Sequence, residues 1–416
     1  MASDSTTHLG AACVWFEDEA GCPTSGDGRP LVLMLHASYR CRGGEETSLE
    51  AEAACFQELG YRVRLFTRDN SSVRNGVGGA LRALFDVRTF WEVRRECIRH
   101  KPTIVYVNNL WPSLSASALL AVRLQSLPTL QALHNYRLVT PSARLDDAGA
   151  CAICGSTRLP FGCIVHRCYR SLSATALCAL ASAIVRFVVV GWRHHWYLTP
   201  SEASRHRLVK GGLRSSRFLV RRNFLLRPGP LSEQRRNAVS FVGRLSEEKG
   251  IAELVRNWPL RPGFPVLEVI GEGPLYEQLS SLSTDHRNVR LLGAQTQPTV
   301  LELMASSLLT AVPSMWAEPF GLVALESMSV GTPVLTTGHG GLAEIVGDTG
   351  VLLDTCSADR IESVVDSVLN PVAYARLVQA CRSRAESDYS LTTAASEMQN
   401  ILRSVLAAHP SKGSRP

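Results

Sequence analysis

The sequence has few charged residues for its length, and acidic residues are nearly missing from one long stretch. Asp, Glu, Lys and Arg make up 19% of the 416 residues against 45% hydrophobic residues. That balance is typical of a globular chain and excludes a mainly disordered one. Glu202 is the one acidic residue between positions 151 and 217, a stretch with ten basic residues. A chain this long exceeds the usual size of one hydrophobic core, so we expect two domains.

The net charge of +7 hides an asymmetry between the two halves of the chain. Residues 1–228 hold 29 Lys and Arg against 17 Asp and Glu, whereas the remaining residues hold 15 against 20. A basic first half indicates an anionic partner, such as a membrane surface, a lipid phosphate or a nucleic acid. An arginine-rich surface in contact only with water would have the same composition.

An export signal and a clear membrane-spanning run are also missing. Acidic residues cluster at 17–19 and no apolar segment precedes Gly21, so we expect residues 1–30 to form a loose tail. The longest apolar run, residues 173–191, contains Arg186 and favours a buried helix followed by a strand. Without export, the 12 cysteines are expected to be reduced thiols in a cytoplasmic protein.

Hydrophobic runs predict that the first half alternates strands with helices. Continuous apolar runs such as LVLMLH are typical of buried strands, and residues 80–99 have the pattern of a basic amphipathic helix. We expect the arginines of the strand at 61–67 to alternate out of the sheet. The predicted strands are 31–36, 61–67, 103–109, 128–135 and 195–201. This alternation predicts an α/β domain with a parallel sheet.

The second half restarts the alternation after an aperiodic segment between Arg222 and Leu231. Its predicted strands are 238–244, 266–273, 288–293, 308–314, 331–337 and 349–354, with a helix capped by Ser246. The predicted domains are therefore 31–222 and 223–389, with tails at 1–30 and 407–416. Two such sheets would leave a cleft between them, with glycine-rich loops at the carboxyl ends of the strands.

Two glutamates, Glu318 and Glu326, flank the start of a predicted helix. The preceding strand ends near Pro313, which places Glu318 on the following loop and Glu326 about one turn into the helix. The free N–H groups at the start of this helix form an anion site. That site would be made by Phe320, Gly321, Leu322 and Val323. A diphosphate bound there would have a carboxylate near each end for the hydroxyls of a sugar and a ribose, which predicts a nucleotide-sugar site.

Two more segments are predicted to lie at the carboxyl ends of the strands of the second sheet, near the two glutamates. Arg244 and Lys249 stand between a strand and the next helix, where cations could take the charge of a diphosphate. In V-I-G-E-G-P the glycines would let the backbone approach a base or ribose closely. The residues of that turn are Gly271, Glu272, Gly273 and Pro274.

The three segments G-R-L-S-E-E-K-G, V-I-G-E-G-P and E-P-F-G-L-V-A-L-E resemble the donor-domain motifs of the retaining glycosyltransferases of family 4, in the same order. G-G-L-A-E-I-V at 340–346 fits the same pattern. The first half resembles one bacterial branch of that family through R-G-G-E-E, H-N-Y-R-L, R-C-Y-R and R-R-N-F. Over roughly residues 31 to 406, the resemblance implies a GT-B fold. That fold has two facing Rossmann-like domains, an interdomain cleft and a last helix (about 390–406) packing back on the first domain.

The resemblance also implies residue roles and a reaction. The catalytic candidates are Glu318 facing the donor sugar, His134 near sugar and acceptor, and Arg244 and Lys249 on the diphosphate. Glu326 would bind the ribose. The donor-binding set is Gly43, Gly44, Arg244, Lys249, Gly271, Glu272, Gly273, Pro274, Glu318, Phe320, Gly321, Leu322, Val323 and Glu326. The first domain would bind the acceptor, and the anomeric configuration would be retained.

No cofactor is expected for this transfer, because two cations and helix-end amides would stabilise the leaving diphosphate and the sequence has no Asp-x-Asp metal motif. A separate group of cysteines could hold a structural zinc or remain reduced thiols. Its members are Cys151, Cys154, Cys163 and Cys168. Relatives in the branch commonly have Cys where this chain has Thr140, so a zinc site would need Cys163 as the replacement ligand. Many also have histidines where Tyr106 and Asn108 stand, which would change the acceptor chemistry.

The leading hypothesis is therefore a retaining, metal-independent glycosyltransferase of cell-surface polysaccharide synthesis. It would move a sugar from a nucleotide-diphosphate donor to a glycan or lipid-linked acceptor in the cytoplasm. Its basic half could contact the anionic inner face of the membrane. A sugar-nucleotide epimerase of the same fold is the alternative. A basic nucleic-acid-binding protein would leave both glutamates unexplained, so no nucleic acid is expected as a partner.

Overall fold

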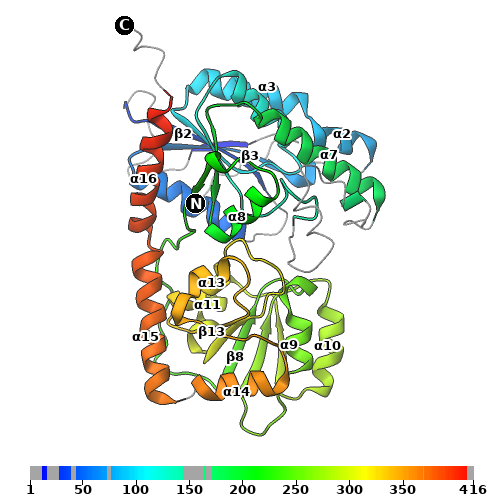
Figure 1. The fold of residues 1–416 in the computed structure, drawn as a ribbon, viewed down its shortest axis with the longest axis vertical. Helices are drawn as coiled ribbons and strands as arrows, with labels where there is room; N and C mark the ends of the chain where they lie inside the picture. Colours follow the sequence, from blue (N-terminus) through cyan, green and yellow to red (C-terminus); the bar gives the residue numbers. More distant parts are fainter. Residues whose placement is uncertain are drawn as a thin grey trace. The chain divides into compact units, whose positions relative to one another are not determined.

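The computed structural model divides into two compact units (Figure 1). It describes residues 12–15, 28–38, 44–72, 76–143, 163–164, 171–368 and 370–409. Among these, unit 1 takes the residues of Met1–Thr199, Arg205–Arg221 and Ala394–Pro416, and unit 2 takes those of Pro200–Ser204 and Arg222–Thr393. The last helix from Ala394 onward therefore belongs to unit 1, although the segment before it belongs to unit 2.

A seven-stranded sheet forms the centre of unit 1. Its strand order is β1-β3-β2-β4-β5-β6-β7, and every neighbouring pair is parallel except β1 with β3. The strands are β1 (Ala12–Trp15), β2 (Leu31–Ser38), β3 (Arg62–Asp69), β4 (Ile104–Asn109), β5 (Thr129–Ala132), β6 (His195–Thr199) and β7 (Phe218–Val220). β2 is buried along almost its whole length, as a parallel strand covered on both faces should be.

Helices surround this sheet, and two of them begin within unit 2. The helices are α1 (Gly44–Glu58), α2 (Val77–Leu84), α3 (Val87–His100), α4 (Ser115–Leu124), α7 (Leu172–Val189), α8 (Glu202–Lys210) and α16 (Leu391–Ala407). Short 3-10 turns lie at η1 (Asn70–Ser72) and η2 (Ser215–Arg217). The helices that begin within unit 2 are α8 and α16.

Unit 2 is built on a six-stranded parallel sheet in the order β10-β9-β8-β11-β12-β13. The strands are β8 (Ala238–Val242), β9 (Val266–Ile270), β10 (Val289–Gly293), β11 (Leu309–Val312), β12 (Val334–Thr336) and β13 (Val351–Leu352). The helices and 3-10 turns are η3 (Glu247–Lys249), α9 (Ile251–Arg256), α10 (Tyr276–Asp285), α11 (Gln297–Ser306), α12 (Leu322–Ser329), α13 (Gly341–Val346), η4 (Gly347–Thr349), α14 (Ala358–Val368) and α15 (Pro371–Asp388). The predicted α/β class with two largely parallel sheets is confirmed.

Three local predictions were wrong. Part of the expected N-terminal tail, Ala12–Trp15, forms β1 and pairs with β3. The expected single helix at 80–99 is two helices, because Asp86 caps α3 by accepting a hydrogen bond from the Arg88 N–H at 3.0 Å. Ser246 does not cap a helix with its side chain: a 3-10 turn follows it, and α9 begins only after Gly250.

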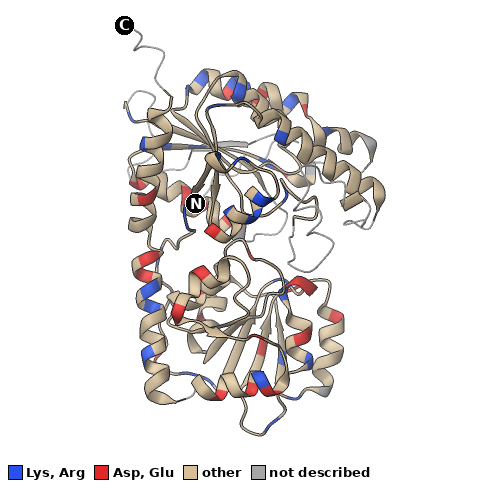
Figure 2. Cartoon of the chain, viewed as in Figure 1, with Lys and Arg blue, Asp and Glu red and all other residues tan. Residues whose placement is uncertain are grey.

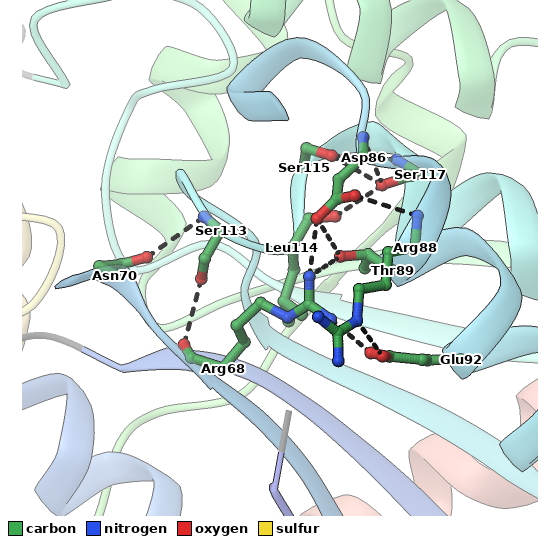
Figure 3. Close-up of polar contacts among 10 residues, drawn as sticks. All are labelled: Arg68, Asn70, Asp86, Arg88, Thr89, Glu92, Ser113, Leu114, Ser115 and Ser117. Carbon is green, nitrogen blue, oxygen red and sulfur yellow. Dashed lines mark hydrogen bonds and ion pairs between the residues drawn. The ribbon is translucent and has the colours of Figure 1, made fainter. Parts of the chain in front are cut away.

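The arginines of β3 are the fourth correction: Arg64 and Arg68 are buried, whereas Arg62 is partly exposed. The Arg64 side chain is buried and donates to Glu96 of α3 at 2.6 Å. Arg68 is buried too, and its guanidinium donates to Asp86 and Thr89 and pairs with Glu92, as Figure 3 shows. The polar face of β3 is thus covered by α3, whose carboxylates balance the arginine charge.

The long apolar helix α7 packs within unit 1. Its buried residues include Thr175, Cys178 and Val185, and Ser182 donates to the Arg137 carbonyl at 2.8 Å. In the part of the chain that the structure describes, α7 is the one helix long and apolar enough to cross a membrane by length and composition, and 39% of it is buried. As predicted, a strand follows it.

Candidate functional site

The candidate site in unit 2 lies where the strand order reverses. The sheet runs from β8 to β9 and β10 on one side and from β11 to β12 and β13 on the other. The loops that leave neighbouring strands β8 and β11 therefore diverge at their carboxyl ends, which is where open α/β sheets bind ligands. Arg244 and Lys249 lie after β8, and Glu318 lies after β11.

Backbone contacts hold these two loops together. The Met315 N–H donates to the Glu248 carbonyl at 2.9 Å. Gly250 has φ +70° and approaches so closely that a Cβ atom would lie 2.0 Å from the Pro313 carbonyl oxygen. Only glycine fits there, both for its left-handed backbone and for the contact.

An ion pair joins the two loops through their side chains. The Lys249 ammonium donates to Glu318 Oε1 at 2.5 Å, and Ser314 donates to the same oxygen at 2.7 Å. Glu318 is 6% exposed. The Lys249 ammonium also lies 5.7 Å from the centre of the Trp316 ring, close enough for a cation–π contact. The structure thus brings Lys249 and Glu318 together, and Ser314 is a partner that sequence reasoning missed.

The start of α12 offers backbone donors. Gly321 precedes the helix with φ +119°, and no side chain caps it. The first backbone hydrogen bonds of this helix begin at Ala324, which donates to the Gly321 carbonyl at 3.0 Å. Within the described residues, the Leu322 and Val323 N–H groups have no acceptor, so they can receive an anion. Phe320, two residues before Leu322, is buried.

The turn after β9 packs so closely against the loop after β8 that two of its positions have room only for glycine. A Cβ atom on Gly271 would lie 2.0 Å from the Gly243 carbonyl oxygen, and one on Gly273 would lie 2.4 Å from the Leu245 carbonyl oxygen. The Leu245 N–H donates to the Glu272 carbonyl at 2.9 Å. These contacts fix the turn against the loop that carries Arg244. The Glu272 side chain and Pro274 are exposed.

Arg244 and Glu326 differ in their surroundings. Arg244 is exposed and forms no ion pair with any described residue. Glu326, on α12, accepts a hydrogen bond from Gln297 of α11 at 2.8 Å. Burial raises the pKa of the Glu326 carboxyl to about 7, and the Gln297 hydrogen bond opposes that rise. Sequence reasoning missed Gln297, because nothing in the local pattern of α11 marks it.

In unit 1, His134 lies in a chain of polar side chains at the carboxyl ends of β2, β4 and β5. His134 Nε2 is 2.9 Å from Asn108 Oδ1, and Asn108 Nδ2 is 3.0 Å from His36 Nδ1. His36 Nε2 lies 4.0 Å from Glu46. Burial and the neighbouring His36 lower the pKa of His134 to about 4, so it is neutral near pH 7. A histidine inside the otherwise apolar LVLMLH run was the available signal for His36.

The remaining predicted residues are only partly described. Gly44 is the first residue of α1, and Gly43 lies outside the described residues. Of the four cysteines proposed for zinc, Cys163 is described. It is buried, with its sulfur 3.5 Å from the Thr140 hydroxyl. Cys151, Cys154 and Cys168 lie outside the described residues, and within the described residues no group of three or more His, Cys, Asp or Glu side chains could hold a metal ion. The zinc hypothesis stays a prediction.

Solved structures define the fold class. HepE of Anabaena, solved in complex with UDP and glucose, superimposes with a TM-score of 0.63 over 90% of this chain and all of that chain, at 19% identity. Sucrose-phosphate synthase of Thermosynechococcus elongatus gives a TM-score of 0.66 over 91% of this chain and all of the other, at 15% identity. Two units with Rossmann-like sheets that match these enzymes have the GT-B fold.

Sequence comparison finds relatives of the second unit. Residues 225–385 match the family model "Glycosyl transferases group 1". Glycogen synthase of Mycobacterium tuberculosis is 34% identical over 205 residues, which are 47% of this chain and 47% of that enzyme. The match thus spans about half the length of that relative. The part of unit 2 between residues 225 and 385 is therefore similar to the glycosyl transferases of group 1.

Proposed function

We propose that the protein transfers a sugar from a nucleotide-diphosphate donor to a glycan or lipid-linked acceptor, with retention of configuration and without a catalytic metal. The observation that carries this proposal is the arrangement at the switch point of unit 2. A Lys249–Glu318 pair lies on the two loops that diverge there, and the Leu322 and Val323 amides open the helix that follows. The complex of HepE with UDP and glucose supports a nucleotide-sugar ligand.

Each candidate residue has a distinct part in this reaction. Arg244 and Lys249 bind the diphosphate and stabilise the charge that develops on it as the glycosidic bond breaks. The Glu326 carboxylate accepts from ribose hydroxyls, and Glu318 keeps Lys249 in place and faces the sugar. The acceptor oxygen attacks the anomeric carbon on the face that the diphosphate leaves, and the departing phosphate oxygen takes the acceptor proton.

Unit 1 holds the acceptor in this proposal. A cavity of about 70 Å³ lies at the carboxyl ends of β4 and β5, lined by His134, Asn108 and Trp111 among others. The Arg137 guanidinium lies 5.6 Å from the centre of the Trp111 ring at the same cavity. Aromatic and arginine side chains with a neutral histidine suit a sugar or a phosphate-linked sugar. A neutral His134 can accept or donate a hydrogen bond at an acceptor hydroxyl.

The acceptor is proposed to be presented at the inner face of the membrane. On α3, Val87, Trp91 and Ile98 are exposed although they are large and apolar. The same helix carries four arginines and two glutamates (Figure 2). Exposed apolar and basic side chains on one helix suit the interface of an anionic membrane. The proposal therefore includes a cytoplasmic protein that meets its acceptor at the inner face of the membrane.

A calorimetric screen of UDP- and GDP-sugars tests the donor site. We expect one nucleotide class to bind, and Arg244→Gln to weaken that binding by about tenfold because a charge-assisted contact to phosphate is lost. Arg290→Gln is the matched control, since Arg290 is another exposed arginine of unit 2. Equal affinity in the two variants, or no binding of any nucleotide-sugar, would contradict the assignment. Release of an epimerised sugar nucleotide without acceptor would favour the epimerase alternative.

A further inference from the structure

A second cavity of unit 1 lies at the amino ends of strands β6 and β7, whereas His134 lies beyond the carboxyl end of the neighbouring strand β5. Its volume is about 130 Å³, and its lining includes Arg186 at the end of α7, Arg214 and Arg217. His195, the first residue of β6, also lines it, and Arg217 directly precedes β7. The cavity is therefore at the amino ends of these parallel strands, whereas Asn108 and His134 are at carboxyl ends. We call it the α7 basic pocket.

The charge of this pocket is not balanced by the protein. Among the described residues no Asp or Glu lines it, and Arg186 has no carboxylate within 4.0 Å. The hydrogen bond found for the Arg186 guanidinium is a long one, 3.4 Å to the Gly212 carbonyl. Burial lowers the pKa of Arg186. A partly desolvated guanidinium without a counter-ion is costly, and a bound anion would remove that cost.

A buried donor at the same pocket also lacks an acceptor. Trp192 is 5% exposed, lines the pocket, and its indole N–H forms no hydrogen bond with the described residues. Most buried donors in proteins are paired, so an unpaired one at a cavity indicates a missing acceptor. The surrounding groups are held in place: Arg217 donates to the Arg193 carbonyl at 2.7 Å and lies 5.8 Å from the Trp196 ring centre.

We propose that the α7 basic pocket binds a phosphate group, carried either by a lipid headgroup or by a soluble phosphate compound. Three guanidinium groups and an indole N–H supply donors for its oxygens. Phe187 and Val190, 78% and 59% exposed, place apolar surface beside the pocket. Leu172 and Leu180 continue that exposed apolar face along α7. An anionic group next to apolar chains is the chemistry of a phospholipid at a membrane surface.

Two binding assays distinguish the sources of the phosphate. Calorimetry with inorganic phosphate and glycerol 3-phosphate measures the soluble form. Flotation with phosphatidylcholine vesicles, with and without phosphatidic acid, measures the lipid form. Binding in either assay supports the proposal and identifies the source of the phosphate, provided that substitutions in the pocket weaken that binding. Neither assay depends on donor binding or sugar transfer, so its outcome is separate from that of the proposed function.

The variants are chosen to preserve the fold. Arg186→Gln removes a charge and Trp192→Phe removes the indole donor but keeps an aromatic ring. We expect Arg186→Gln to weaken binding by about tenfold and Trp192→Phe by about threefold. Arg193→Gln is the control, because it removes the same charge next to the pocket but does not line it. Binding in neither arm, or equal loss in Arg186→Gln and Arg193→Gln, would overturn the proposal.

Discussion

The Lys249–Glu318 pair shows how one contact can serve both folding and function. Each residue lies on a different loop, and the pair holds the loops together at the point where the sheet order reverses. A motif comparison assigns Lys249 to the diphosphate and Glu318 to the sugar. The structure adds that the two side chains bind each other. Because an ammonium group has three N–H donors, Lys249 could keep its bond to Glu318 while it binds a diphosphate.

Removal of Lys249 tests the structural part of this role. We expect Lys249→Met to lower the free energy of unfolding by about 1–3 kcal/mol, because it leaves the buried Glu318 carboxylate with Ser314 as its known donor. Adding Glu318→Gln should recover about 1 kcal/mol of that loss. Urea unfolding of both single variants and the double variant measures the coupling, with Arg290→Met as a surface control. Additive losses would mean that the two side chains do not interact.

The raised pKa of Glu326 predicts a pH dependence of donor binding. A carboxyl with a pKa of about 7 is largely protonated at lower pH, and a ribose hydroxyl donates best to the ionised form. Nucleotide-sugar affinity should therefore rise by about tenfold or more between about pH 5.5 and about pH 8. The diphosphate of a nucleotide-sugar does not titrate in that range. Glu326→Gln should flatten the profile, and an unchanged profile in that variant would contradict the assignment.

The raised pKa of Glu326 has the opposite effect on the stability of the protein alone: stability should fall, not rise, as the pH increases. Because the pKa of Glu326 is raised on folding from 4.5 to about 7, the folded state binds more protons between these values. The contribution of this group to stability is therefore present at low pH and decreases as the pH rises through about 7. Ligand binding and ligand-free stability should move in opposite directions across this range.

At the scale of elements, the cluster around Arg68 fastens α3 to the sheet (Figure 3). We expect Arg68→Met to lower the free energy of unfolding by about 3 kcal/mol, since it leaves the partly buried Asp86 without its cation and Glu92 with the exposed Arg88 alone. Arg88→Met is a matched control, because Arg88 pairs with the same Glu92 but its side chain is 63% exposed. The control should cost less than about 1 kcal/mol. Urea unfolding measures both, and equal losses would contradict the role given to Arg68.

Sequence patterns predicted the secondary structure well where hydrophobicity alone decides whether a segment forms a buried strand. The buried strands were found because continuous apolar runs have few other readings. Several ends were placed too late, as at 308–314, where β11 ends at Val312. The ends of β2 and β3 were placed too early, since these strands continue to Ser38 and Asp69. The break at Asp86 is a local N-cap, which the apolar pattern alone did not reveal. The burial of Arg64 could not be predicted, because it depends on how α3 packs on β3. Such pairings join residues distant in sequence.

At the scale of the whole molecule, the division into two units agrees with separate tasks for the two halves of the sequence. The group 1 match lies within unit 2, which carries the candidate donor residues. Unit 1 carries His134, the α7 basic pocket and the exposed face of α3, features that no local motif predicted in full. The His36–Asn108–His134 chain, for example, links three strands and becomes visible only in the folded sheet. Its acceptor role remains a proposal.

The most direct test of the account is a crystal structure of the protein soaked with a UDP- or GDP-sugar that binds in the calorimetric screen. The account predicts the diphosphate on the Leu322 and Val323 amides, with Arg244 and Lys249 on its oxygens and Glu326 on the ribose. A diphosphate bound elsewhere, with the Lys249–Glu318 pair untouched and these amides still without a ligand, would contradict it.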